Sequence, residues 1–204
     1  MTDPKTGKGT GLAATVRRAL KEMLATEIPF CVIGATALAA RGLPRMTRDL
    51  DLAVMVDDAA AAWQALRMAG LEPSTPTGSI DDPEPMVVFA DPRSGVEVDL
   101  LVAAGDPEAI VIDQAERAQV FGVSAPVAGL EHLLLLYFYS NQPKHLGDFA
   151  SIVQSERADL ASAERLLAEI HAEMLPEWRR RVHAARHPAP PPPRPPKRVR
   201  KKKS

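Results

Sequence analysis

The sequence predicts an α+β protein with an α/β front half, an all-helical back half and a basic tail. In the first 105 residues, short runs rich in aliphatic residues alternate with segments of helical periodicity. After Gly105 the apolar spacing is helical as far as about His187, and "HPAPPPPRPPKRVRKKKS" then combines prolines with basic residues and cannot pack a core. We therefore expect an α/β core at 1–105, a helical subdomain at 106–187 and a disordered tail at 188–204.

The chain opens with an amphipathic helix, because "GLAATVRRALKEMLAT" (11–26) places apolar residues at helical spacing with basic residues between them. "PFCVIG" then predicts a short buried strand that stops at Gly34. The alanine-rich segment "ATALAARG" predicts a short helix closed by Gly42, since glycine is common at helix C-termini. The apolar run 50–56 predicts a second strand.

A helix, a loop and a hairpin complete the front half. "DDAAAAWQALRMAG" predicts the helix, with acids at its start and Gly70 at its end. Residues 72–85 are rich in Pro, Ser, Thr and Asp and predict a loop. "MVVFA" and "VEVDLLVA", separated by "DPRSG", predict an antiparallel hairpin. Four helices are expected in the back half, over 108–118, 130–140, 145–154 and 158–175.

Two aspartates stand two residues apart at the start of the strand predicted at 50–56. Residues i and i+2 share a face of a strand, so Asp49 and Asp51 point the same way, opposite Leu50 and Leu52. Like charges this close raise each other's pKa unless a cation lies between them. The pair therefore indicates a metal site, whereas a strand entrance with solvated acids is the simpler alternative.

A third acid, Asp99, lies within the apolar strand "GVEVDLLV". If this strand lies beside the first acidic strand, three carboxylates converge at one end of the sheet. Mg²⁺ prefers oxygen ligands and binds through a few carboxylates together with substrate phosphates. Two such ions promote in-line displacement at phosphorus, so the three acids predict phosphoryl-transfer chemistry.

The turn before these acids fits the same chemistry. Gly34, Ala35 and Thr36 follow a predicted strand and open a helix, where free backbone N–H groups face an anion. Arg45 and Arg48 add positive charge that could contact a triphosphate. A strand–glycine–helix junction is also a common structural joint, so the turn alone does not establish a phosphate site.

The stretch "IGATALAARGLPRMTRDLDLAV" resembles the nucleotidyltransferases of the polymerase-β-like fold, specifically the AbiEii/MenT-type toxin group of minimal nucleotidyltransferases. The pattern of that group is a Gly-Gly-x-Ala turn, a Gly-x-x-Arg-x-Thr-x-Asp-x-Asp run and a distant third Asp. It falls on Gly34, Ala35, Ala37, Gly42, Arg45, Thr47, Asp49, Asp51 and Asp99. In "GLEHLLLLYFYSNQPKHLGDFASIV" the group's helical segment matches at Glu131, Lys144 and Asp148. The resemblance covers about residues 29–153.

This resemblance implies a mixed sheet flanked by helices, and Mg²⁺-dependent transfer of a nucleoside monophosphate from a nucleoside triphosphate such as ATP to an acceptor hydroxyl. Asp49, Asp51 and Asp99 would be the catalytic residues and would hold two Mg²⁺ ions. The residues implied to bind the nucleotide are Gly34, Ala35, Thr36, Arg45, Thr47, Lys144 and Asp148. The resemblance further implies a toxin of a toxin–antitoxin or phage-defence module, with tRNA ends as the acceptor and a cognate antitoxin as partner.

Two positions depart from the group's pattern. Ala35 replaces the second glycine of the turn, and Tyr137 or Tyr139 stands where the group often has a nucleotide-contacting lysine. A tyrosine can stack on a base or donate a hydrogen bond but supplies no charge. Lys144 would then have to neutralise the charge of the triphosphate in place of that lysine.

The charge of the chain is strongly asymmetric. Eleven of the 25 Lys and Arg residues, and none of the 26 Asp and Glu residues, lie from Arg179 onward, so this segment carries +11 and the rest −12. A terminal basic cluster on a proline-rich spacer attracts polyanions, so the tail at 194–203 predicts attraction to RNA. A tail that only aids solubility is the alternative.

Two further features bound the location of the protein. Cys31 is the single cysteine and cannot form an intramolecular disulfide, which favours a reducing compartment. No apolar run approaches a membrane span, and "MTDPKTGKGTG" lacks the hydrophobic core of a signal peptide. We therefore expect a cytoplasmic protein without membrane contact.

Two other functions compete with RNA modification. A catalytically silent nucleotidyltransferase fold could serve as a nucleic-acid-binding module that acts through the tail, which the missing lysine favours and the three aspartates oppose. Modification of a small molecule, as by antibiotic-adenylylating relatives, is another alternative. A zinc site is not expected, because the five histidines show no ligand spacing with cysteine.

Overall fold

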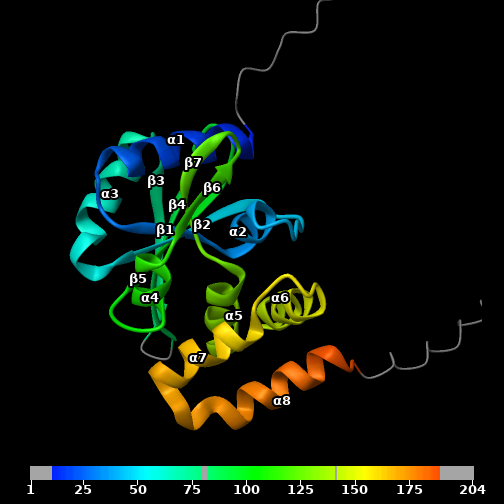
Figure 1. The fold of residues 1–204 in the computed structure, drawn as a ribbon. Coiled ribbons are helices and arrows are strands. Elements are labelled where there is room, and N and C mark those ends of the chain that lie inside the picture. The colour runs from blue at the N-terminus through cyan, green and yellow to red at the C-terminus, as the bar shows by residue number, and fades with distance from the viewer. Residues whose placement is uncertain (1–10, 80–81, 141, 189–204) are drawn as a thin grey trace, which may run out of the picture.

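The computed structural model describes residues 11–79, 82–140 and 142–188 (Figure 1). Its α-helices are α1 (Leu12–Ala25), α2 (Gly34–Ala40), α3 (Ala59–Met68), α4 (Glu108–Asp113), α5 (Leu130–Tyr139), α6 (Pro143–Gln154), α7 (Leu160–His171) and α8 (Leu175–Arg186). Its strands are β1 (Phe30–Ile33), β2 (Asp49–Met55), β3 (Glu72–Ser79), β4 (Asp82–Ala90), β5 (Glu97–Ala103), β6 (Glu116–Val120) and β7 (Val123–Val127). Short 3₁₀ turns, η1 (Val56–Asp58) and η2 (Ala172–Met174), precede α3 and α8.

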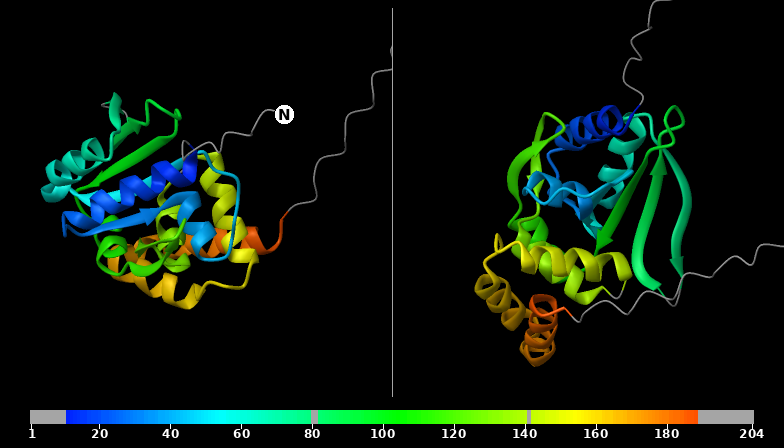
Figure 2. Two further views of the ribbon diagram at one scale, coloured as in Figure 1. Left: turned by 90° about the horizontal axis from the view of Figure 1, so that it is seen from above. Right: turned by 90° about the vertical axis from the view of Figure 1, so that its right-hand side faces the viewer.

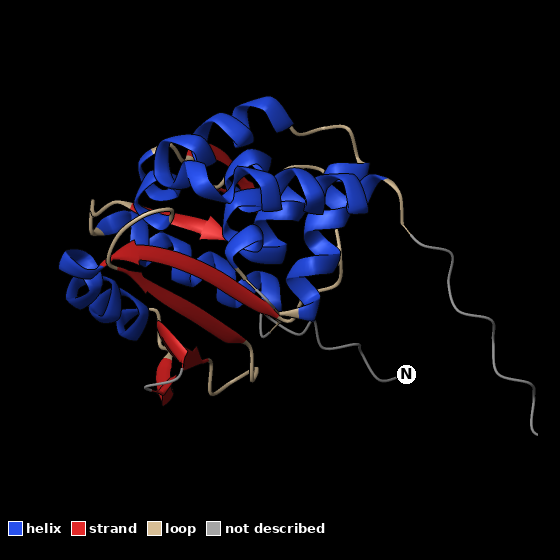
Figure 3. Ribbon diagram, turned by 90° about the horizontal axis from the view of Figure 1, so that it is seen from below, coloured by secondary structure: helices blue, strands red, loops and turns tan. Residues whose placement is uncertain are grey.

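The described strands form a seven-stranded mixed sheet in the order β3-β4-β5-β2-β1-β7-β6. β2 pairs in parallel with β5, and β1 with β7, whereas the remaining neighbours are antiparallel. The strands run between helices (Figure 3). The predicted α+β class is therefore confirmed, as is the antiparallel hairpin formed by the strands around "DPRSG".

One face of the sheet is apolar and packs against α1 and α3. The register aligns Phe89 with Val98 and Val98 with Leu50, so these three side chains share that face, and all are buried. Trp63 of α3 meets the Phe89 ring edge-on at 5.0 Å between ring centroids. Since α1 packs on α3, the two helices cover this face together.

The opposite face of β2 and β5 carries the acids and is turned toward α4 and α5. Beyond α5, helices α6 to α8 form a separate layer at one end of the molecule (Figures 1 and 2). Trp178 of α8 is fully buried there, at 5.5 Å from the rings of Phe138 and Phe149. This aromatic cluster fixes α5, α6 and α8 to one another, and α5 packs on α4, which in turn contacts β2 and β1 of the sheet.

The loop predicted at 72–85 is wrong, because β3 and the start of β4 occupy most of it. The loop was predicted because the segment is rich in proline, which is rare inside sheets. β3 is an edge strand, where a proline needs no partner on the free side. In β4 only 86–90 pair with β5, so Pro83 and Pro85 precede the part of the strand that has neighbours on both sides. The backbone ladder therefore tolerates them.

The expectation of an all-helical chain after residue 105 is also wrong. The helix predicted at 108–118 ends at Asp113, and residues 116–127 form the β6–β7 hairpin, which extends the sheet. β6 is an edge strand with mostly exposed residues, so its sequence lacks an apolar alternation. Its tight turn is Phe121-Gly122, both at positive φ, a primed turn without the usual Asn-Gly signal.

The remaining expectations divide between the two ends of the chain. The helix predicted at 158–175 is α7 followed by η2, and α8 continues as far as Arg186. The predicted disordered tail at 188–204 lies outside the described residues except for Pro188. The division into domains after residue 105 stays a prediction, although the sheet takes two strands from beyond it. The described helices include none with the length and hydrophobicity that a bilayer crossing requires.

Candidate active site

Four carboxylates form a two-by-two block where β2 and β5 run side by side. The parallel register pairs Asp51 with Asp99 and Asp49 with Glu97. Residues paired in register project from the same face of a sheet. Sequence periodicity placed Asp49 and Asp51 on one face and required the second strand to lie beside them for Asp99 to join, and this is the arrangement found. Glu97, the exposed fourth member, was missed, although its spacing of two from Asp99 marked it.

Charge and burial act together on the inner pair. Burial, and then the charges of Asp49 and Asp99, raise the pKa of Asp51 to about 7 against the opposing effect of Lys144 and Arg45. Burial, and then Asp49 and Glu97, raise the pKa of Asp99 to about 6. The ionised form of both groups is therefore disfavoured, and a cation between them would relieve this.

Gly34 presses directly against Asp51. It joins β1 to α2 with φ +64, in the left-handed region that glycine adopts without strain. A Cβ added here would lie 1.9 Å from Oδ2 of Asp51. Only glycine leaves space for that carboxyl, so the position of Asp51 requires a glycine at residue 34. Ala35 beside it is fully buried.

The two threonines predicted at the site hold the backbone around Asp49. The Thr47 hydroxyl donates a short hydrogen bond to the Asp49 carboxylate, and Thr36 donates to the backbone oxygen of Asp49 at 3.4 Å. Both line a hollow next to the acidic pocket, together with Arg45. In this arrangement they orient the start of β2.

Arg45 and Asp148 contact each other. The Arg45 Nε lies 2.9 Å from Oδ1 and 3.0 Å from Oδ2 of Asp148, and the carboxylate is buried. This pair joins the loop before β2 to α6 across 103 residues of sequence. Because Asp49 follows Arg45 by only four residues, the pair ties the helical layer to the acidic site.

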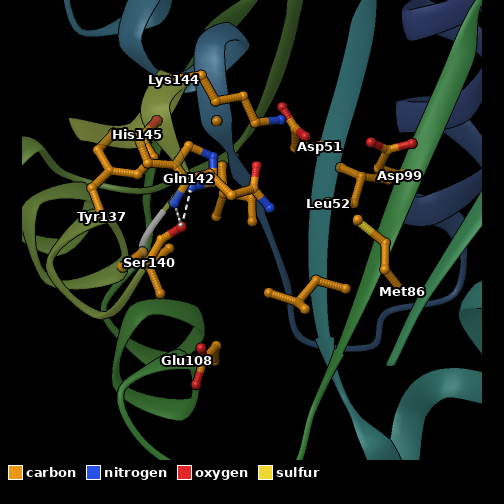
Figure 4. A pocket seen from close by; sticks show the side chains of 14 residues that line it. Asp51, Leu52, Met86, Asp99, Glu108, Tyr137, Ser140, Gln142, Lys144 and His145 are labelled. Carbon is orange, nitrogen blue, oxygen red and sulfur yellow. Dashed lines mark hydrogen bonds between the residues drawn. The ribbon is translucent and has the colours of Figure 1, made fainter. Parts of the chain in front are cut away.

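A pocket opens between the acidic face and the helical layer (Figure 4). Of the predicted residues, it brings together Gly34, Asp51, Asp99 and Lys144, and the Lys144 side chain extends toward Asp51 (Figure 4). The residues of its wall that sequence reasoning did not place there are Ile33, Leu52, Met86, Leu101, Glu108, Leu136, Ser140, Gln142 and His145. Tyr137 also lines it.

An aromatic stack forms the helical wall. The rings of Tyr137 and His145 are stacked, with centroids 4.9 Å apart and an angle of 27° between their planes, and His145 Nδ1 lies 2.6 Å from the Ser140 hydroxyl. Burial, and then the Lys144 charge, lower the pKa of His145 to about 4, so its ring is neutral at neutral pH. Sequence reasoning weighed the histidines only as zinc ligands and therefore passed over this one.

The acids suit a divalent cation by their chemistry. Oδ1 of Asp99 is buried without a hydrogen-bond partner in the described part of the chain, and the absence of a Cβ at Gly34 leaves space for the Asp51 carboxyl. Within residues 11–79, 82–140 and 142–188, no three His, Cys, Asp or Glu side chains are arranged as a finished metal site. The Asp49 carboxylate accepts a hydrogen bond from the Thr47 hydroxyl.

A mixed sheet with paired aspartates beside a glycine turn, capped by helices, defines the nucleotidyltransferase class. The model of a family described as "Nucleotidyl transferase of unknown function (DUF2204)" matches residues 13–185. The chain belongs to this family. No sequence among the curated proteins matches it significantly.

Solved structures similar to this chain include an antibiotic-resistance factor and an antibiotic adenylyltransferase. The solution structure of the antibiotic-resistance factor ANT(2'')-Ia is 16% identical, with a TM-score of 0.55 over 84% of this chain and 97% of that chain. A crystal structure of ANT(2'')-Ia with adenylyl-2''-tobramycin has the same identity and TM-score, over 79% and 97%. The lincomycin-bound lincosamide antibiotic adenylyltransferase LnuA is 12% identical, with a TM-score of 0.48 over 70% and 97%. At these identities, the likeness to ANT(2'')-Ia establishes the fold.

Proposed function

We propose that the protein transfers a nucleoside monophosphate from a nucleoside triphosphate to an acceptor hydroxyl, with Mg²⁺ as cofactor. The observation that carries this proposal is the lateral pairing of Asp51 with Asp99, with Asp49 on the same face of the sheet. Family membership supports the same reaction class.

Asp49, Asp51 and Asp99 are the proposed ligands of two Mg²⁺ ions. When bound, Mg²⁺ neutralises triphosphate charge and stabilises both oxygens of an in-line displacement. Gly34 leaves space for the Asp51 carboxyl, and Ala35 and Thr36 follow it in the turn that is proposed to bind the phosphates. Lys144 binds the phosphate oxygens from the opposite wall of the pocket.

In the proposed reaction, the acceptor oxygen forms a bond to the α-phosphorus, and the bond from that phosphorus to the leaving pyrophosphate breaks. Asp99 helps to take the proton of the acceptor hydroxyl. Arg45, Thr47 and Asp148 act next to the nucleotide by holding the Asp49 loop against α6. Helix α6 thereby covers one side of the site and limits the access of water, which would otherwise compete with the acceptor.

For the acceptor we propose RNA, with tRNA ends as the first candidate, in a cytoplasmic toxin of the AbiEii/MenT-like group that a cognate antitoxin restrains. The supports are the motif run 33–54 and the +11 charge from Arg179 onward, which would draw RNA to a chain that is otherwise acidic. The single cysteine supports the compartment.

A small amine-bearing acceptor is the second candidate. The similarity to ANT(2'')-Ia in complex with adenylyl-2''-tobramycin extends over most of both chains. Tobramycin is an amino sugar with several hydroxyl groups. Glu97 at the rim of the acidic block offers a contact for an ammonium group. The same rim would repel an RNA backbone, so the two acceptors place opposite demands on Glu97.

Incubation of the full chain with Mg²⁺ and each labelled nucleoside triphosphate tests both candidates. Total cellular RNA is the acceptor in one arm, and a panel of amino sugars in the other. Label in RNA supports the toxin proposal, and label in an amino sugar supports the second. An Asp51→Asn variant that transfers as well as wild type would overturn the metal assignment. Mg²⁺-independent RNA binding without transfer in any arm would instead favour a silent binding module.

A further inference from the structure

Tyr137 presents an unexplained polar group at the pocket. It lies on α5, its side chain lines the pocket beside Asp51 and Lys144, and the residue is 3% exposed. Its hydroxyl is buried and has no hydrogen-bond partner among the residues that the structure describes. A buried unpaired hydroxyl is unfavourable, so a folded protein rarely retains one without a reason. A partner that enters with a ligand is such a reason.

The ring of Tyr137 is held in place by its neighbours. It stacks on His145, whose Nδ1 is fixed by the Ser140 hydroxyl, and Ser140 also accepts from the backbone N–H of Gln142. Ser140, His145 and Tyr137 therefore support one another along the helical wall of the pocket (Figure 4). A binding group that is fixed before the ligand arrives loses less conformational entropy on binding.

The surroundings decide what the hydroxyl can do. Burial, and then the charges of Asp148 and Asp51, raise the pKa of Tyr137 further above its ordinary value, so the group is a protonated donor. Asp148 is already paired with Arg45. A protonated hydroxyl that lines the same pocket as the Lys144 ammonium is matched by an anionic oxygen as its partner.

We infer that the Tyr137 hydroxyl is a nucleotide-binding group that donates a hydrogen bond to a phosphate oxygen of the nucleoside triphosphate. The inference rests on the proposed function, because it needs the triphosphate to occupy this pocket. Tyr137 and Lys144 then bind the triphosphate together, one as an uncharged donor and the other as a cation.

Tyr137→Phe removes the hydroxyl and keeps the ring that stacks on His145. Loss of a hydrogen bond to a charged acceptor is expected to raise the dissociation constant for the Mg²⁺–nucleoside triphosphate about tenfold or more. The melting temperature of the free protein should stay the same or rise, because the removed group is unpaired. Tyr139→Phe is the matched control, since Tyr139 is on the same helix and its hydroxyl already pairs with His171 Nδ1 at 2.8 Å.

Calorimetry with the full chain separates the contacts. Inorganic tripolyphosphate with Mg²⁺ is titrated beside each nucleoside triphosphate. Equal weakening of both ligands by Tyr137→Phe, with Tyr139→Phe close to wild type, supports the phosphate contact. Weakening for the nucleotides alone would overturn it, because the hydroxyl would then contact base or sugar. If wild type binds nucleotide and Tyr137→Phe binds it with the same affinity, the inference is overturned and the proposed function stands. If wild type binds no nucleotide, the proposed function is overturned together with the inference.

Discussion

Asp51 and Asp99 are direct lateral neighbours in parallel strands, so the sheet itself holds two carboxylates together in a partly buried site. Backbone pairing fixes the separation of the two strands at about 4.8 Å and leaves the side chains little freedom to move apart. The free protein therefore stores repulsion at this place. Removal of one charge should improve folding and impair function.

Asp51→Asn tests this trade-off. The variant should lose nucleotide transfer by at least about a hundredfold and should gain about 2 kcal/mol of unfolding free energy at pH 8 in chelator, because it removes a desolvated like charge. Urea unfolding and a transfer assay measure the two effects. Mg²⁺ should raise the melting temperature of wild type and leave this variant unchanged. Glu169→Gln, an exposed change on α7 outside the acidic block, is the control for stability. An Asn variant less stable than wild type in chelator would contradict the argument.

Gly34→Ala should abolish transfer by displacing Asp51. Gly95→Ala is the matched control, since Gly95 has φ +68 against +64 at Gly34, with no atom within 4 Å of its added Cβ. The left-handed backbone costs both variants about 1–2 kcal/mol. Only at Gly34 does the methyl also meet the Oδ2 of Asp51, where misplacement of about 1 Å costs on the order of a hundredfold in rate. Equal activities of the two variants would refute the role assigned to the close contact.

The Arg45–Asp148 pair should couple stability to the site. Arg45→Ala strands a buried carboxylate, whereas Arg45→Ala with Asp148→Ala removes both partners. The double variant should therefore be more stable than the sum of the two single changes predicts, by about 1–2 kcal/mol. Urea denaturation of the four proteins gives this coupling. Simple additivity would mean that the two side chains do not depend on each other in solution.

The fully buried Asp91 predicts how stability depends on pH outside the active site. Although its burial opposes ionisation, hydrogen bonds from Thr15, Arg93 and Arg18 hold the pKa of its carboxyl well below its ordinary value. A lowered folded-state pKa adds stability that is complete above the unfolded pKa, about 3.9, and is lost as the pH falls below it. Asp91→Asn should cost about 3 kcal/mol at pH 7.

Unfolding of wild type and Asp91→Asn at pH 7, 5 and 3 checks the prediction for Asp91. The difference between them should be the same at pH 7 and 5 and smaller at pH 3. Transfer activity at pH 7 should survive, because Asp91 joins the turn after β4 to α1, away from the acidic pocket. A difference that grows toward low pH would contradict the sign of the shift.

The acidic half of the site was predictable because strand geometry is local. A spacing of two placed Asp49 and Asp51 on one face, and the apolar alternation around Asp99 identified the strand that had to lie beside them. The helical half was not predictable in the same way. Contacts such as Arg45–Asp148 and Tyr137–His145 depend on how helices dock onto the sheet, which no periodicity in the sequence reports.

The errors in the fold have a related cause. β6 and β3 lie at the two edges of the sheet, where exposure removes the hydrophobic alternation that identifies a strand. Prolines at 73 and 76 are tolerated in β3 because an edge strand leaves one side unpaired. The position of a strand at the sheet edge therefore explains both observations: its sequence lacks the alternation that would identify it, and it can contain prolines.

The basic tail gives the last prediction. Seven of its residues from Arg194 to Lys203 are Lys or Arg, against a net −12 before Arg179. Deletion of 188–204 should weaken RNA binding and flatten its salt dependence, because fewer counterions are released from the phosphates. Affinities for total RNA at low and moderate salt, for the full chain and the deletion, measure both. The change of Lys201, Lys202 and Lys203 to Gln should give an intermediate slope, since it removes charge and keeps length. Transfer to a small uncharged acceptor should be unchanged in both variants, and equal RNA affinities with equal salt slopes would reduce the tail to an aid to solubility.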